Sequence, residues 1–325
     1  MKTIEYYIQL AEKAINNLKY PENPRGLYEP IAYGLGNGGK RLRPALVLAA
    51  CEAIGRDCES ALNQAAAVEM YHNYTLFHDD VMDNADIRRG KPSVRAKWDD
   101  NTAILSGDTL LTLAVAKVVE GVDSEKAIRL LSIFNKAAIE VYEGQQYDME
   151  FETRDSVSIE EYVEMVRLKT SVLLGCACSL GAEMADASAK QRDALYQFAM
   201  NLGVAFQLQD DLLDVYGDPA IFGKAIGGDI MNNKKTFLLI TAQQKATGDD
   251  KEELNYWLNN PNAFPGEKIA AITALYNRLG ADTACRDAIN TYNAKALAAL
   301  EDSDLCAEAA EFFRTFAESI MGRKK

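Results

Sequence analysis

Residues 61–83 read ALNQAAAVEMYHNYTLFHDDVMD, and this stretch sets the fold class of the whole chain. Apolar residues recur at intervals of three and four over residues 61–77, a spacing that predicts one long helix with an apolar face. That helix leads into DDVMD at residues 79–83. The pattern returns at residues 193–214, where a second helical repeat leads into DDLLD. Two apolar helices that each end in DDxxD therefore organise the sequence.

Helical spacing also governs the rest of the chain. It recurs over residues 4–18, 103–119, 127–141, 162–174 and 268–279, and no long alternating pattern of a β-strand interrupts it. Glycine and proline are expected to mark the joints, among them Gly121, Gly144 and Gly181. No low-complexity linker divides the chain. We therefore expect an all-α fold and a single domain over residues 1–325.

Composition excludes several classes of protein. The 325 residues are 48% hydrophobic, and the net charge of -13 argues against nucleic acid as the main partner. The longest apolar runs are shorter than the roughly 20 residues of a membrane span, and the N-terminus lacks the apolar core of a signal peptide, so a cytoplasmic protein is expected. The six cysteines contain no CxxC pair, which favours small buried thiols over disulfides or zinc.

The two DDxxD motifs have the spacing of metal sites. Asp79 and Asp83 are four apart, so on a helix they share one face, and Asp210 and Asp214 do the same. Magnesium suits such carboxylates because it takes one or two of them, keeps water, and fills its remaining positions with substrate phosphate. The alternative is a solvated acidic helix face. The apolar residues on both sides of each motif argue against it, since semi-buried aspartates need cations or donors.

Basic residues accompany each acidic motif. Lys40 and Arg43 follow two glycines and stand three apart near a helix start, so they can converge on one anion, although a solvated turn is an alternative. RRGK at residues 88–91 follows the first motif, and GK at residues 223–224 and KKT at residues 234–236 follow the second. Such cations can bind the diphosphate oxygens that metal ions do not reach.

The chain has two histidines, His72 and His78. His72 lies seven residues before Asp79, two helical turns back on a similar face, and is expected to donate to substrate phosphate. The alternative is a histidine satisfied within the core. His78 points elsewhere and is expected to be structural.

Taken together, these blocks resemble the trans-isoprenyl diphosphate synthases of the polyprenyl synthetase family over roughly residues 25–240. The matching blocks are GKRLRP at 39–44, HDDVMD at 78–83 with RRG at 88–90, GQQYD at 144–148, KT at 169–170, and FQLQDDLLD at 206–214 with GD at 217–218 and GK at 223–224. The resemblance implies a bundle of antiparallel helices around a central cavity, working as a homodimer on small-molecule diphosphates.

The resemblance also implies a role for each matching residue. The implied ligands of about three magnesium ions are Asp79, Asp83 and Asp210, supported by Asp80, Asp211 and Asp214. The implied allylic diphosphate site is Arg88, Lys169 and Lys224, with Lys234 nearby. The implied isopentenyl diphosphate site is Lys40, Arg43, His72 and Arg89. Thr170 and Gln207 are implied to face a carbocation formed by ionisation, which condenses with the isopentenyl double bond and then loses a proton.

Product length is expected to depend on the helix before the first motif. Tyr74 and Tyr71 precede Asp79 by about 7.5 Å and about 12 Å along the axis, so a bulky ring there can close the floor of the cavity. Either tyrosine could instead pack in the core. An aromatic residue at the Tyr74 position accompanies farnesyl or geranylgeranyl products in the family, which predicts a short product.

Three other functions share part of this pattern. A terpene cyclase is expected to lack the basic block at 39–44 and to carry a mixed second motif. A carboxylate-bridged di-iron protein needs two ExxH motifs, and the chain offers only Glu69 with His72. A non-catalytic synthase subunit is not expected to keep both aspartate motifs complete. The sequence therefore favours a magnesium-dependent prenyltransferase.

Overall fold

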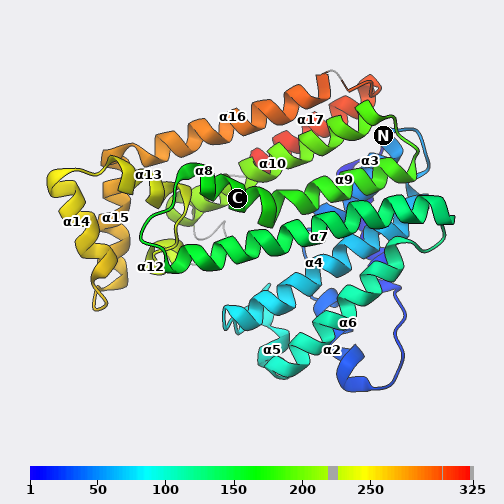
Figure 1. Ribbon diagram of the computed structural model, residues 1–325, viewed down its shortest axis with the longest axis horizontal. Helices are drawn as coiled ribbons and strands as arrows, with labels where there is room; N and C mark the ends of the chain where they lie inside the picture. The colour runs from blue at the N-terminus through cyan, green and yellow to red at the C-terminus, as the bar shows by residue number, and fades with distance from the viewer. Residues whose placement is uncertain (219–225, 302, 323–325) are drawn as a thin grey trace. The chain divides into compact units, whose positions relative to one another are not determined.

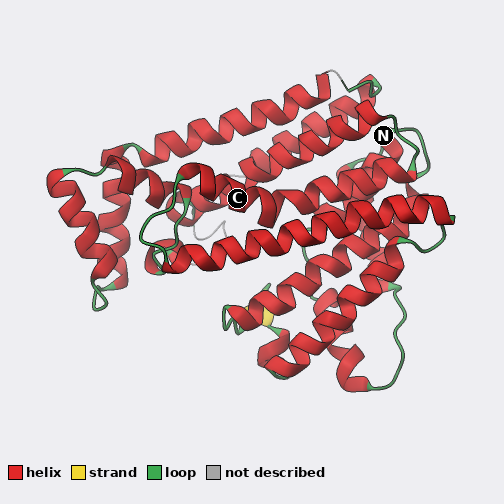
Figure 2. Ribbon diagram, viewed as in Figure 1, coloured by secondary structure: helices red, strands yellow, loops and turns green. Residues whose placement is uncertain are grey.

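The computed structural model describes residues 1–218, 226–301 and 303–322, and it is helical almost throughout (Figure 2). The helices are α1 (Ile4–Asn16), α2 (Arg25–Gly36), α3 (Leu42–Ala53), η1 (Cys58–Ala61), α4 (Leu62–Met82), α5 (Val94–Lys97), α6 (Asp100–Val118), α7 (Ser124–Thr153), α8 (Ile159–Val166), η2 (Arg167–Ser171), α9 (Val172–Met184), α10 (Ala189–Tyr216), α12 (Gly228–Met231), α13 (Phe237–Lys245), α14 (Gly248–Asn259), α15 (Pro265–Leu279), α16 (Ala281–Glu301) and α17 (Ala307–Met321). A two-residue hairpin, β1 (Ile87–Arg88) with β2 (Lys91–Pro92), follows α4. The all-α expectation is confirmed.

The chain divides into two compact units. The first comprises the described residues within 1–138, 173–196 and 303–312. The second comprises those within 139–172, 197–302 and 313–325. The first motif belongs to the first unit and the second motif to the second unit. The expectation of a single domain stays a prediction.

In the first unit, α4 is the central helix. It packs along α6 and also contacts α3 and α1, and Figure 1 shows α4 and α6 side by side. Its buried positions include Val68, Tyr71 and Phe77, in agreement with the predicted spacing. Gly107 of α6 allows the close approach, because a Cβ there would lie 2.6 Å from the His78 ring. The first motif is therefore held at the end of a well-packed helix.

In the second unit, α10 lies in a core formed with the C-terminal helices. Leu208 and Leu212 of α10 are buried in one cluster with Ile240 and Ile272. Around this cluster, α13 packs against α15 and α16, and α14 packs against α15. The leucines flank Asp210 and Asp211, so burial of this face places the second motif at the edge of the core.

Two of the predicted joints are wrong. Gly144 lies inside α7 and Gly181 lies inside α9, whereas Gly121 does separate two helices. The reason is close packing. A Cβ at Gly144 would lie 2.3 Å from the backbone nitrogen of Lys169, and one at Gly181 would lie 2.1 Å from the carbonyl oxygen of Val47. Both glycines are therefore contact points between elements and do not end helices.

One described segment, Ile159–Met184, has the length and apolar composition of a membrane-crossing helix, but 72% of its most apolar window is buried inside the protein. Burial of this kind is typical of a core helix. The segment also holds Cys176 and Cys178. All six cysteines are free and only Cys306 is exposed, which agrees with the expectation of small buried thiols.

Candidate active site

A basic cluster lies in the first unit where the loop between α2 and α3 meets α4 and the hairpin. Gly38 and Gly39 have φ of 77° and 135°, a region that L side chains rarely adopt. Arg89 donates to the carbonyl oxygen of Gly38, and its guanidinium would lie 2.7 Å from a Cβ at Gly39. Arg43 Nη1 lies 3.4 Å from His72 Nε2. Three of the four predicted isopentenyl diphosphate ligands thus come together, and Lys40 is exposed on the same loop.

The electrostatics of this cluster suit an anion. The Nε of Arg43 is buried and finds no hydrogen-bond acceptor in the part of the chain that the structure describes. Burial, followed by the charges of Arg43 and the other nearby arginines, lowers the pKa of His72 well below its usual value. His72 is therefore neutral near pH 7, and its Nε2 can accept from Arg43. A phosphate oxygen would supply the acceptor that Arg43 Nε needs.

The first aspartate motif is tied to the hairpin through its middle residue. Asp80 is 2% exposed and accepts from Nε and Nη2 of Arg88 at 2.8 and 2.5 Å. Burial raises the pKa of Asp80, and the hydrogen bond and charge of Arg88 oppose that rise. Asp79 is half-buried, and Asp83 is exposed as the C-cap residue of α4. The two outer carboxylates are therefore the solvent-accessible members of the motif.

The second aspartate motif is tied to α8 through its own middle residue. Asp211 is 4% exposed and accepts from the hydroxyl of Tyr162 and, at 3.1 Å, from Nε2 of Gln207. Burial raises the pKa of Asp211 to about 7, although both hydrogen bonds oppose the rise. The hydroxyl of Thr170 donates to Gln207 Oε1 at 3.3 Å, so the two residues expected to face a carbocation are hydrogen-bonded partners.

The predicted diphosphate ligand Lys169 lies in η2, a π-helical turn held between α7 and α10. Its Nζ lies 2.5 Å from Asp148 Oδ2. Burial would raise the pKa of Asp148, but the charges of Lys234 and Lys169 outweigh it and keep the pKa below its usual value. Two glycines let the neighbouring helices approach η2 closely. A Cβ at Gly144 would lie 2.3 Å from the backbone nitrogen of Lys169, and a Cβ at Gly203 would lie 2.6 Å from Oγ of Ser171.

Asp214, the last residue of the second motif, anchors the turn that precedes α12. Its carbonyl oxygen accepts from the nitrogen of Gly227 at 2.6 Å, and its Oδ2 accepts from the nitrogen of Asp229 at 3.0 Å. Lys234 is exposed beyond α12. The predicted ligand Lys224 lies outside the described residues. Asp214 therefore fixes the backbone at the start of α12, and its support of the metal ligands stays a prediction.

The carboxylates of the two motifs can bind magnesium one or two at a time. No three Asp, Glu, His or Cys side chains converge on one point among the residues described. Magnesium does not need such a group, because one or two carboxylates suffice when phosphate and water complete its coordination. Asp79 and Asp83 in the first unit and the half-buried Asp210 in the second supply hard oxygen donors of this kind.

The aromatic residues before the first motif contact one another in tilted and edge-on arrangements. The Tyr74 ring lies 5.6 Å from the Tyr71 ring and 4.7 Å from the His78 ring. Tyr71 is fully buried, with its hydroxyl bonded to the carbonyl oxygen of Ala138, whereas Tyr74 is half-buried. His78 Nε2 lies 3.2 Å from the carbonyl oxygen of Ile104, and its structural role stays a prediction. Tyr74 is thus the better candidate for a cavity floor.

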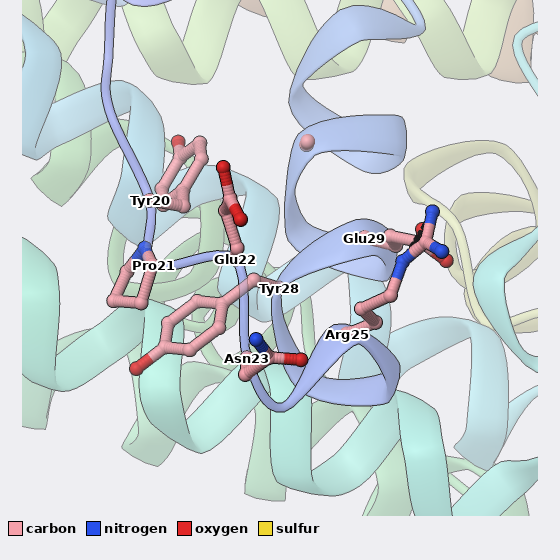
Figure 3. Close-up of a pocket in the computed structure, with 8 residues that line it drawn as sticks. Tyr20, Pro21, Glu22, Asn23, Arg25, Tyr28 and Glu29 are labelled. Atoms are coloured by element: carbon pink, nitrogen blue, oxygen red, sulfur yellow. Dashed lines mark hydrogen bonds and ion pairs between the residues drawn. The ribbon is translucent and has the colours of Figure 1, made fainter.

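A separate surface pocket of about 420 Å³ lies beside α2 (Figure 3). Its lining includes Tyr20, Tyr28 and Glu22, together with the hydrogen-bonded pair Arg25 and Glu29. None of the predicted site residues lines it. With two carboxylates and one paired arginine it is unsuited to a diphosphate.

Comparison with known proteins agrees with this geometry. The sequence model of the polyprenyl synthetase family matches residues 24–277. The chain belongs to the polyprenyl synthetase family. The short chain isoprenyl diphosphate synthase of Methanocaldococcus jannaschii is 42% identical over 267 residues, which cover 82% of this chain and 81% of that protein. The geranylgeranyl diphosphate synthase of Methanosarcina mazei is 42% identical over 72% of each chain.

Solved structures of the family have the same fold as this polyprenyl synthetase. A crystal structure of a geranylgeranyl pyrophosphate synthase superposes with a TM-score of 0.93 at 42% identity, covering 100% of both chains. The geranylgeranyl pyrophosphate synthetase of Pyrococcus horikoshii superposes with a TM-score of 0.91 at 34% identity, covering 98% of this chain and 97% of that one.

Sequence reasoning missed three residues of this polyprenyl synthetase. Asp148 is the partner of Lys169, and its presence in the GQQYD block was the available signal. Tyr162 binds Asp211 and stands in no distinctive motif. Glu69 was noticed only as part of an ExxH pair with His72, and its role as an ion-pair partner of Arg41 was missed. Such partners lie far apart in sequence, so no local spacing of residues predicts them.

Proposed function

We propose that this chain is a magnesium-dependent trans-prenyltransferase that condenses isopentenyl diphosphate with an allylic diphosphate and releases farnesyl or geranylgeranyl diphosphate. The observation that carries the proposal is the buried Nε of Arg43, which has no hydrogen-bond partner among the described residues and lies in a cluster of cations beside a helix that ends in an acidic motif. The relatives named as short-chain and geranylgeranyl diphosphate synthases support the same reaction class.

Isopentenyl diphosphate binds at the basic cluster of the first unit in this proposal. Arg43 and Arg89 donate charge-assisted hydrogen bonds to its phosphate oxygens, and Lys40 closes the site from the loop. His72 stays neutral and donates through one ring nitrogen while the other faces Arg43. The glycine backbone at 38–39 lets the anion approach the loop closely.

The acidic motifs and the remaining cations hold the allylic diphosphate. Asp79 and Asp83 of the first motif and Asp210 of the second are the proposed magnesium ligands, and bound magnesium stabilises the negative charge of the departing pyrophosphate. Arg88, Lys169 and Lys234 bind the oxygens of that group, with Lys224 assigned by resemblance alone. Asp80, Asp211 and Asp214 orient their neighbours through the contacts described above.

The carbocation that ionisation leaves is stabilised by neutral dipoles. Thr170 and Gln207 are hydrogen-bonded to each other, and their oxygen atoms offer partial negative charge to the cation while being weaker nucleophiles than a thiolate or amine. The apolar residues around both motifs exclude water, which would otherwise quench the cation. The isopentenyl double bond then attacks the cation, and pyrophosphate is the proposed acceptor of the proton that is lost.

The rival functions have less support. A terpene cyclase needs no isopentenyl site, whereas this chain has the basic cluster in which we place one. A di-iron protein would use Glu69 as an iron ligand, but Glu69 binds Arg41 and accepts a hydrogen bond from Asn73. A non-catalytic subunit has no need of both motifs, and both are held by specific contacts here.

Product assay tests the proposal directly. Purified protein is incubated with labelled isopentenyl diphosphate, magnesium, and dimethylallyl, geranyl or farnesyl diphosphate in turn, and the dephosphorylated products are sized. We expect all-trans products of 15 or 20 carbons, loss of product when EDTA is added, and recovery with excess magnesium. Absence of any prenyl product with all three primers would refute the assignment.

We also propose that the enzyme is a homodimer. Leu105 of α6 and Ile128 of α7 are 60% and 70% exposed in the first unit, and a second copy would cover them. Light scattering of the native protein is expected to give twice the chain mass, and Leu105→Lys to shift it toward the monomer. A monomeric wild-type protein would contradict this. A cytoplasmic location stays a prediction.

A further inference from the structure

Arg41 stands between the two proposed ligands Lys40 and Arg43 but has a different environment. Its side chain is fully buried, with Nε 2.5 Å from Glu12 of α1, Nη1 bonded to Glu69 of α4, and Nη2 2.5 Å from the carbonyl oxygen of Leu35 in α2. Its backbone is left-handed, with φ of 49° and ψ of 29°. A non-glycine residue in that region needs compensating contacts, and these three bonds supply them.

Glu69 lies on α4 and is the acidic residue closest in sequence to His72 of the proposed isopentenyl site. Its side chain is 3% exposed, and it stands three residues before His72 and four before Asn73, which donates to it at 3.0 Å. Its negative charge acts on Arg43 and Arg89 as well as on Arg41. Without Arg41, this buried carboxylate would lose its ion-pair partner and would attract Arg43.

We propose that Arg41 is a positioning residue that occupies Glu69, so that Arg43 remains available for the diphosphate of isopentenyl diphosphate. The inference rests on the proposed function for its substrate and on the observed ion pairs for its mechanism. Arg41 binds no substrate itself. It keeps a buried carboxylate from neutralising the neighbouring cation, and it fixes the turn from which Lys40 and Arg43 project.

A double-mutant cycle separates this role from general support of the fold. Arg41→Met is expected to raise KM for isopentenyl diphosphate about tenfold or more, with a change below about threefold in KM for the allylic substrate. Glu69→Gln alone is expected to change KM for isopentenyl diphosphate less than about threefold. The double variant is expected to return to within about threefold of wild type, because no acidic group is left to capture Arg43.

Other outcomes overturn the inference. If the double variant binds isopentenyl diphosphate as poorly as Arg41→Met, Arg41 acts through the fold alone. If Glu69→Gln by itself raises that KM more than fivefold, the charge of Glu69 assists binding. Arg129→Met is the matched control, since Arg129 lies 2.5 Å from Glu183, whose side chain is 4% exposed. Arg129 is 40% exposed and Arg192 also binds Glu183, so the substitution weakens an ion pair of a buried carboxylate elsewhere in the unit, and it is expected to leave KM for isopentenyl diphosphate unchanged.

Calorimetric titration of inorganic pyrophosphate in EDTA gives a readout that does not need turnover. Binding is expected to weaken about tenfold in Arg41→Met and to recover in the double variant. If that pattern holds while wild type makes no prenyl product, the positioning role stands and the proposed function fails. If product forms but the pattern is absent, the positioning role fails alone. Should Arg41→Met not fold, a fivefold weakening in Glu69→Gln overturns the proposal, and unchanged or tighter binding supports it.

Discussion

The two DDxxD motifs have the same spacing, yet they hold their middle aspartates in opposite electrostatic ways. Asp80 on α4 is buried against the guanidinium of Arg88, a full positive charge. Asp211 on α10 is buried against neutral donors, the hydroxyl of Tyr162 and the amide of Gln207. Burial raises the pKa of both carboxyls, and that of Asp211 is raised to about 7. One sequence signature thus encodes two different anchors.

The largest expected effect concerns the outer aspartates, which should behave alike. Asp79→Asn and Asp210→Asn each remove a proposed magnesium ligand, and we expect kcat to fall about 10²–10³-fold in each. Initial rates at saturating substrates and magnesium measure this. Asp155→Asn, at an exposed position, is the control and should stay within about twofold of wild type. A drop below fivefold at one motif would show that the two motifs are not equivalent in catalysis.

The pH dependence of stability should distinguish the middle aspartates. Because the folded-state pKa of Asp211 is raised to about 7, its stabilising contribution is complete at low pH and is lost as pH rises. Between pH 5 and pH 7 the wild-type protein should lose about 1–3 kcal/mol of unfolding free energy relative to Asp211→Asn. Urea unfolding in EDTA at both pH values tests this. Parallel pH profiles for the two proteins would disprove the assignment.

Asp80→Asn should show the same trend with a smaller amplitude, because burial raises the pKa of Asp80 and Arg88 only partly opposes the rise. Between pH 5 and pH 7, wild type should therefore lose less unfolding free energy relative to Asp80→Asn than it loses relative to Asp211→Asn. The same urea experiment measures it. Arg25→Met, which removes the exposed ion pair with Glu29, serves as the control and should leave the pH profile unchanged. If wild type gains unfolding free energy relative to Asp80→Asn as pH rises, the charge of Arg88 outweighs the burial of Asp80.

The smallest expected change in rate concerns the position five residues before each motif. A substitution there is expected to change the length of the product clearly. Tyr74 occupies it on α4 and Ala205 on α10, so only the first helix presents a ring there. Tyr74→Ala should lengthen the product by one or two isoprene units with kcat within about tenfold. Tyr71→Phe keeps the buried ring and should not alter length. An unchanged product from Tyr74→Ala would remove the proposed floor.

Much of the fold and of the site followed from local pattern. Apolar spacing predicted the long helices, and the adjacency of Arg43, His72 and Arg89 agrees with the family resemblance. What the sequence did not reveal depends on partners distant along the chain, such as Tyr162 with Asp211 and Asp148 with Lys169. Gly144 and Gly181 were misread because a glycine looks the same in sequence whether it ends a helix or admits a neighbouring backbone.

The π-helical turn η2 has a consequence for how the second unit moves. Gly144 and Gly203 touch it from α7 and α10, while Lys169 and Thr170 on it bind Asp148 and Gln207. Opening of the turn would break these four contacts together. Amide hydrogens of residues 167–171 should accordingly exchange with solvent as one cooperative block.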